Sequence, residues 1–231
     1  MNMLPELGVF IAFEGIDGAG KSTIARATYN KVSELRSDFN YIDKNRPPVL
    51  SGYTEFHMSR IREILWDYPD NAPLDELGDQ HWINLIAAWF QATDYAAVRP
   101  LTNSGVNCIA DGWYYKYLAR FLLKGAKLAE DAWEVFSTIR PPDAVIFLDV
   151  DPARAAQRKE SFRPSESGAY DGGNEDRINS FIAYQSQVRS AYERCGLSTW
   201  IRIDTTDLSE EAVLEEAIDA VHNILRKGQR P

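Results

Sequence analysis

The residues whose spacing points most clearly to chemistry lie near the start of the chain. Residues 15–22 read Gly-Ile-Asp-Gly-Ala-Gly-Lys-Ser, which fits the phosphate-binding pattern G-x-x-x-x-G-K-[ST]. In this pattern backbone N–H groups surround a phosphate, the lysine reaches the terminal phosphates and the serine hydroxyl binds Mg²⁺. We therefore expect ATP and Mg²⁺ as cofactors of a phosphoryl transfer. The expected ATP-binding residues are Gly15, Asp17, Gly18, Ala19, Gly20, Lys21, Ser22 and Thr23.

A chance match and a switch GTPase both explain this loop less well than an ATP-binding site does. A glycine-rich turn with a surface lysine would match all four fixed positions by chance in only about one such chain in a hundred. A switch GTPase needs an N-K-x-D signature, and Asp43-Lys44-Asn45 has the wrong order. The apolar run at residues 106–111 ends in a single carboxylate, Asp111, which we expect beside Mg²⁺ together with Ser22.

The elements around the loop predict an α/β fold. Short β-branched or aromatic runs separated by helical stretches indicate buried strands, and continuous rather than alternating apolar runs are typical of a parallel sheet covered on both faces. The predicted strands span residues 9–13, 39–43, 106–111, 144–150 and 199–204.

Helical patterns fill the intervals between these strands. The clearest helix follows Ser209, with acidic residues first, a stripe through Leu214, Ile218, Val221 and Leu225, and Gly228 at its end. The polar stretch at 161–174 contains three glycines, and we interpret it as a mobile loop over the active site. The predicted helices cover residues 21–35, 56–66, 74–98, 113–123, 129–139, 152–159, 175–195 and 209–228.

Length and composition restrict the function. The 231 residues predict one domain, 45% hydrophobic and 26% charged. A net charge of −9 argues against a nucleic-acid-coating protein, which needs a broad basic face. No apolar run reaches 18 residues, so we expect a cytoplasmic protein without a membrane span or secretory signal. Cys108 and Cys195 cannot form a disulfide framework and have no metal-ligand spacing.

Several segments together resemble the thymidylate kinase family of nucleoside-monophosphate kinases. Residues 13–23 are very close to that family's opening, with an aspartate at 17, and residues 142–152 resemble its fourth strand and the turn into its lid. Glu175-Asp176-Arg177-Ile178, Phe181 and Tyr192 follow in family order. The resemblance covers nearly the whole chain. It implies a P-loop kinase fold with a five-stranded parallel sheet, a lid at about 154–174 within a single domain 1–231, and Asp17 as a contact of the acceptor's sugar hydroxyl.

The resemblance fails at acceptor-site positions. The family's third strand usually ends Asp-Arg, whereas this chain has Asp111-Gly112. Phe90 stands where bacterial relatives carry a base-reading arginine, and either core packing or a base platform would account for it. Lys116 and Arg120 replace a serine and a tyrosine; four apart, they share a helix face that either returns the missing charge or is merely solvated.

The remaining acceptor-side and lid positions match better. Arg46, before Pro47-Pro48, resembles the family's Arg-x-Pro phosphate contact, and Arg62 resembles the arginine of the next helix. The lid segment carries a local excess of positive charge, and because the loop has Ala19 where some relatives have arginine, the catalytic cation should come from the lid. Arg158 and Arg163 are the best candidates, followed by Arg177.

The sequence thus predicts a kinase that phosphorylates a dTMP-like nucleoside monophosphate from ATP. The alternatives are a divergent kinase for a nucleoside or another small molecule, suggested by Gly112 and Phe90, and a non-catalytic ATP-binding module. We expect no nucleic-acid or membrane partner. A homodimer through the apolar residues 85–90 fits the pattern, but burial in the core accounts for those residues equally well.

Overall fold

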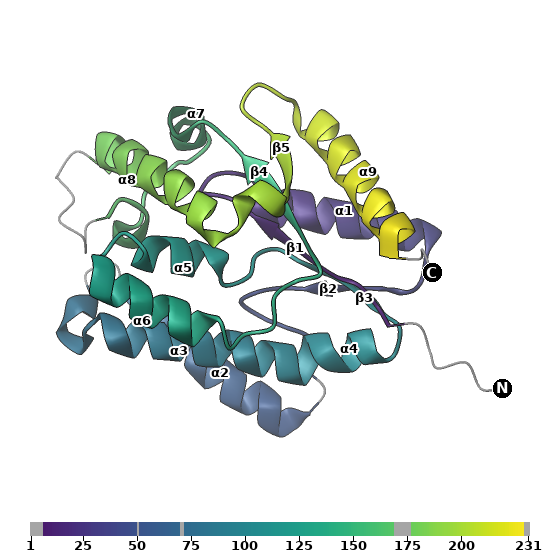
Figure 1. The fold of residues 1–231 in the computed structure, drawn as a ribbon, viewed down its shortest axis with the longest axis horizontal. Coiled ribbons are helices and arrows are strands. Elements are labelled where there is room, and N and C mark those ends of the chain that lie inside the picture. Colours follow the sequence, from purple (N-terminus) through teal and green to yellow (C-terminus); the bar gives the residue numbers. More distant parts are fainter. Residues whose placement is uncertain (1–6, 50, 70–71, 169–176, 229–231) are drawn as a thin grey trace.

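The sheet of this protein is parallel and has the strand order β2-β3-β1-β4-β5 (Figure 1). It is seen in a computed structural model that describes residues 7–49, 51–69, 72–168 and 177–228. The strands are β1 (Phe10–Glu14), β2 (Phe39–Ile42), β3 (Asn107–Ala110), β4 (Ala144–Asp149) and β5 (Ile201–Asp204). The five predicted strands are therefore confirmed, with ends that differ from the predicted limits by at most two residues.

The sheet is buried on both faces, as the continuous apolar runs predict. All residues of β1 and β3 are buried, and helices cover each side. On one face α1 (Lys21–Leu35) packs against α9 (Glu210–Gly228), and the other helices form the second layer (Figure 1). That layer contains α2 (Gly52–Trp66), α3 (Asp79–Thr93), α4 (Arg99–Asn103), α5 (Tyr115–Phe121), α6 (Ala126–Phe136), α7 (Pro152–Gln157) and α8 (Arg177–Ala191).

The parallel register brings the polar ends of the strands to one edge. Glu14 pairs in register with Phe147, and Ala12 with Ala110, so the residues that follow β1 and β3 meet above the sheet. Open parallel sheets bind their ligands at this edge. The edge therefore positions the P-loop beside Asp111.

An ion pair fixes α8 over the sheet. Asp149, at the end of β4, is 1% exposed. It accepts hydrogen bonds from Arg189 Nε at 2.6 Å and Arg189 Nη2 at 2.8 Å, and it also contacts Arg202 on β5. Because a buried carboxylate requires such partners, this contact sets the position of α8.

Some predicted helices have different limits. The helix predicted for 56–66 begins at Gly52, where the Ser51 hydroxyl accepts the Thr54 N–H at 3.1 Å. The long helix predicted for 74–98 is a short 3₁₀ turn (Leu74–Leu77), then α3 and a π-helical turn (Asp94–Val98), with a break at Gly78. The start of the helix predicted at 175 and the loop residues 169–174 lie outside the described residues.

The apolar segment at 85–90 belongs largely to the core of the single chain. Ile86, Trp89 and Phe90 are buried, and Leu85 packs against the core from a partly buried position. Core packing, one of the two alternatives for this segment, accounts for its apolar character. Among the described residues, no helix is both long and apolar enough to cross a membrane.

Candidate active site

The phosphate-binding loop connects β1 to α1 as the sequence predicts. Gly18 has a φ of +81°, and a Cβ there would lie 2.8 Å from the Ala155 carbonyl oxygen, so only glycine fits. Lys21, in the first turn of α1, is 8% exposed. Its Nζ donates to the carbonyl oxygens of Gly15 at 2.9 Å and Ile16 at 2.7 Å. The lysine thus lies folded over the loop whose amides would hold phosphate.

Burial controls the charge of Lys21. Burial lowers the pKa of Lys21, and the nearby Lys116 ammonium lowers it further, against the opposing effect of Asp17. A phosphate placed in the loop would supply the negative charge that this lysine lacks. The site is therefore electrostatically suited to a multiply charged anion.

Asp111 and Ser22 lie on either side of a third cation, Lys44. The Lys44 Nζ is 3.4 Å from Asp111 Oδ2 and 3.5 Å from Ser22 Oγ. Burial lowers the pKa of Lys44, but Asp111 and Tyr117 more than offset this, so the net shift is upward. A carboxylate and a hydroxyl are oxygen donors of the kind that Mg²⁺ takes, usually one or two from the protein together with substrate phosphates.

Asp17 forms ion pairs with two basic residues of α5. Its carboxylate lies 3.0 Å from Lys116 Nζ and 2.5 Å from Arg120 Nη2. Burial opposes ionisation, but Lys116, Arg120 and Lys21 hold the pKa of Asp17 well below its usual range. The helix face formed by Lys116 and Arg120 therefore turns toward the phosphate-binding loop and is not a solvated surface.

These residues open into a cavity of about 270 Å³ between α2, α3, α5 and α8. Its walls combine aromatic rings with charged groups, an arrangement typical of sites that bind a flat ring bearing an anion. The Nε of Arg120 is buried there without a hydrogen-bond partner among the described residues. The polar and aromatic lining includes Asp17, Trp66, Tyr68, Trp82, Lys116, Tyr117, Arg120, Arg163 and Tyr184.

Glu14 supports the loop from below. It is fully buried and accepts the Trp113 N–H at 2.8 Å and the Tyr192 hydroxyl at 3.1 Å. Burial raises the pKa of Glu14 to about 7, against the lowering effects of these bonds and of Lys21. Glu14 therefore links the ends of β1 and β3 and the residues after α8 under the phosphate-binding loop.

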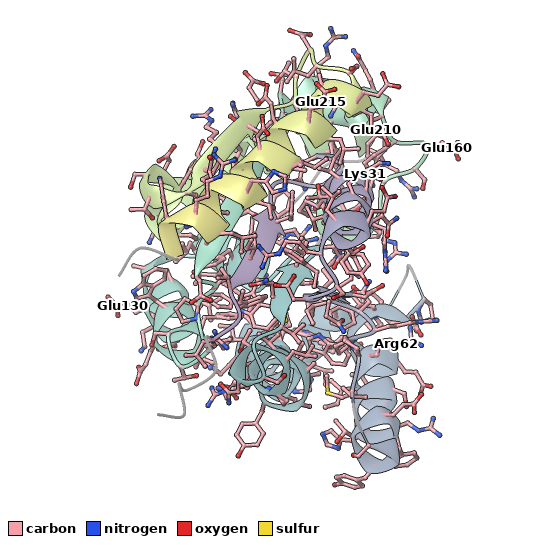
Figure 2. The ribbon with its side chains drawn as sticks, turned by 90° about the vertical axis from the view of Figure 1, so that its right-hand side faces the viewer. Lys31, Arg62, Glu130, Glu160, Glu210 and Glu215 are labelled. Carbon is pink, nitrogen blue, oxygen red and sulfur yellow. The ribbon has the colours of Figure 1, made fainter. Side chains whose placement is uncertain are left out.

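Three predicted acceptor residues lie outside the cavity lining. Phe90 is fully buried and packs edge-on against Trp113, with 5.0 Å between the ring centroids, which matches the core alternative. Arg46 is exposed just after β2. Arg62, visible on α2 in Figure 2, pairs with Asp67 at 2.7 Å.

The predicted lid arginines occupy different places. Arg163 lines the cavity. Arg158 instead donates to the Thr205 carbonyl oxygen at 2.6 Å, after β5. Arg177 is exposed at the start of α8. The structure thus brings one of the two preferred candidates, Arg163, to the cavity.

Two site residues, Lys44 and Gln185, were not predicted from the sequence. Lys44 directly follows Asp43 at the carboxyl end of a predicted strand, and this placement was an available signal. Gln185 lies on α8 and bonds to Asp17. Nothing local in the sequence distinguishes it from the neighbouring exposed glutamine, Gln187.

Comparisons with known proteins point to one family. The family model described as thymidylate kinase matches residues 13–217. A probable thymidylate kinase of Natronomonas pharaonis is 29% identical over 95% of this chain and 100% of its own length. The thymidylate kinase of Leptospira borgpetersenii is 27% identical, covering 96% of this chain and 98% of its own.

Solved structures show the same fold. The thymidylate kinase structure from Candida albicans superposes with a TM-score of 0.66 at 19% identity, covering 97% of this chain and 94% of that one. The thymidylate kinase from Ehrlichia chaffeensis gives a TM-score of 0.61 at 17% identity, covering 93% and 98%. The predicted P-loop kinase fold is thereby confirmed.

Proposed function

Because this chain belongs to the thymidylate kinase family, we propose that it transfers the terminal phosphoryl group of ATP to a nucleoside monophosphate such as dTMP. The observation that carries the proposal is the placement of the cavity directly beside the phosphate-binding loop, with Asp17 shared by both. Two anionic substrates can thus meet end to end. Proximity of this kind is a large part of phosphoryl-transfer catalysis.

The donor side of the reaction rests on the loop amides and Lys21. On binding a triphosphate, the Lys21 ammonium exchanges its two loop carbonyls for phosphate oxygens. Ser22 and Asp111 would hold Mg²⁺, which screens the phosphate charges when bound.

The acceptor side combines recognition with charge. Lys116, Arg120 and Arg163 supply positive charge, while Trp66 and Tyr184 provide aromatic surface for a base. A monophosphate is largely dianionic at neutral pH because its second pKa is near ~6, so its oxygen attacks without a general base. Asp17, held ionised by its two cations, is placed to accept a hydrogen bond from a sugar hydroxyl.

A coupled ADP-release assay tests this function. The acceptor panel contains dTMP, dUMP, dCMP, dGMP and thymidine, each with ATP and MgCl₂, and the Lys21→Ala variant serves as the inactive control. We expect dTMP to give the highest kcat/KM of the panel. The Lys21→Ala variant should show no detectable turnover. If none of the monophosphates in the panel were phosphorylated, the proposal would be contradicted. A preference for thymidine would favour the nucleoside-kinase alternative.

A further inference from the structure

Lys44 is a largely buried lysine whose backbone is fixed and whose ammonium is loosely held. Its N–H donates to Asp111 Oδ1 at 2.8 Å, and its carbonyl oxygen accepts the Trp89 indole N–H at 2.8 Å. The two side-chain contacts, to Asp111 and Ser22, are 3.4 and 3.5 Å long. Strong bonds from an ammonium to oxygen are shorter, about 2.7–2.9 Å, so this group has donor capacity to spare.

Gly112 makes room for this lysine. Its φ of +154° lies in a region that favours glycine, and a Cβ there would stand 3.0 Å from the Lys44 Cδ. An arginine at 112 would therefore compete with Lys44 for the same space. Gly112 therefore leaves free the space that the Lys44 side chain occupies.

Lys44 lies at the junction of the two substrate regions. On one side its ammonium approaches Ser22, the second residue of α1 and the last of the loop pattern. On the other side it interacts electrostatically with Tyr117, which lines the acceptor cavity. Its side chain is only 14% exposed, so water screens its charge weakly.

We propose that Lys44 binds the phosphate of the acceptor and neutralises it during transfer, in place of an arginine at position 112. The inference rests on the proposed function, because it needs an acceptor that carries a phosphate. Asp111 and Ser22, the present partners of the ammonium, are the residues that we assign to Mg²⁺. Once those oxygens are engaged, the flexible lysine side chain can turn its ammonium to the phosphate.

The decisive measurement is calorimetric binding of dTMP and of thymidine to the full-length protein in the presence of MgCl₂ and a non-hydrolysable ATP analogue. The Lys44→Met variant keeps the length of the side chain and removes its charge. We expect its affinity for dTMP to fall about 10- to 100-fold, the size of one charge-assisted hydrogen bond. Affinity for thymidine should stay within about twofold, because thymidine has no phosphate.

Four further variants test how Lys44 acts. Lys44→Arg should retain part of the dTMP affinity, and Lys127→Met, whose side chain is 82% exposed, is the matched control. Gly112→Ala should weaken dTMP binding by displacing Lys44. In the Gly112→Ala, Lys44→Met double variant the two losses should not add, since both act through one ammonium.

The outcomes separate the inference from the proposed function. If Lys44→Met loses affinity for dTMP and thymidine equally, or for neither, then Lys44 serves only as the ionic partner of Asp111 and the inference is wrong. If the wild-type protein neither binds nor phosphorylates any monophosphate in the panel, the proposed function itself fails. An active wild-type enzyme with an unaffected Lys44→Met variant contradicts the inference alone.

Discussion

Asp17 and Gln185 form two hydrogen bonds with each other although they are 168 residues apart in the chain. The Asp17 N–H donates to Gln185 Oε1 at 3.1 Å, and Gln185 Nε2 donates to Asp17 Oδ2 at 3.2 Å. Gln185 Nε2 also donates to the Glu166 carbonyl oxygen at 2.7 Å. One buried side chain therefore joins the phosphate-binding loop, α8 and the segment that carries Arg163.

Removal of this amide should loosen the site. In Gln185→Met the Asp17 N–H stays buried without its partner, so we expect a loss of about 1–3 kcal/mol in the free energy of unfolding. The KM for dTMP should rise because Asp17 is less well positioned. Urea denaturation and steady-state kinetics measure the two effects, with the exposed Gln187→Met on the same helix as control. Equal stability of the two variants would contradict the assigned role.

Replacement of the loop lysine should abolish catalysis while the fold survives. Lys21→Ala removes the ammonium that we assign to the terminal phosphates, and a loss of turnover of about 10³-fold or more is expected. Lys31→Ala is the matched control, because Lys31 lies on the outer side of the same helix with 56% of its side chain exposed (Figure 2). ADP release and circular dichroism provide the readouts. A folded Lys21→Ala enzyme with normal activity would refute the loop assignment.

Arg120 should determine acceptor affinity. Its side chain lines the cavity and its Nη2 binds Asp17, so its positive charge would lie beside the phosphate of an acceptor bound there. We expect Arg120→Met to raise the KM for dTMP about tenfold. The KM for ATP should change little. Arg60→Met, which alters an exposed arginine of α2, should change neither constant. An increase confined to the KM for ATP would place Arg120 on the donor side instead.

The pH dependence of stability should report on Glu14. Its pKa in the folded protein is raised from 4.5 to about 7. Between these two values the folded state binds more protons than the unfolded state, so this group makes stability fall as pH rises. Glu14→Gln should remove that contribution, which is at most about 3 kcal/mol for a shift of this size. Denaturation of both proteins from pH 5 to pH 8 measures the difference, and parallel curves would show that Glu14 does not titrate there.

The two lid arginines should differ in their effect on the acceptor. Arg163 lines the cavity, whereas the Arg158 guanidinium is held by the Thr205 carbonyl oxygen. We therefore expect Arg163→Met to lower kcat/KM for dTMP by about tenfold or more, and Arg158→Met to lower it less. Each variant serves as the control for the other. A larger loss in Arg158→Met would mean that the segment rearranges before transfer.

Features that depend on short-range interactions were predictable from the sequence. The phosphate-binding loop was predictable because its glycines, Lys21 and Ser22 act within eight consecutive residues of the pattern. The strands were predictable because burial on both faces demands continuous apolar runs. A bend was considered for the 74–98 helix, but its place at Gly78, where φ is +70°, was not predicted because the helical pattern continues across that residue.

The sequence by itself determined the fold class, the nucleotide loop and the unusual Asp111-Gly112 pair. Only the tertiary structure decided which charges share the acceptor cavity, because Asp17 and Lys116 are 99 residues apart and meet through helix packing. It also placed Phe90 in the core and Lys44 against Gly112. A local pattern specifies which side of a helix is polar, whereas the partner of that side depends on how α5 and α8 pack over the sheet.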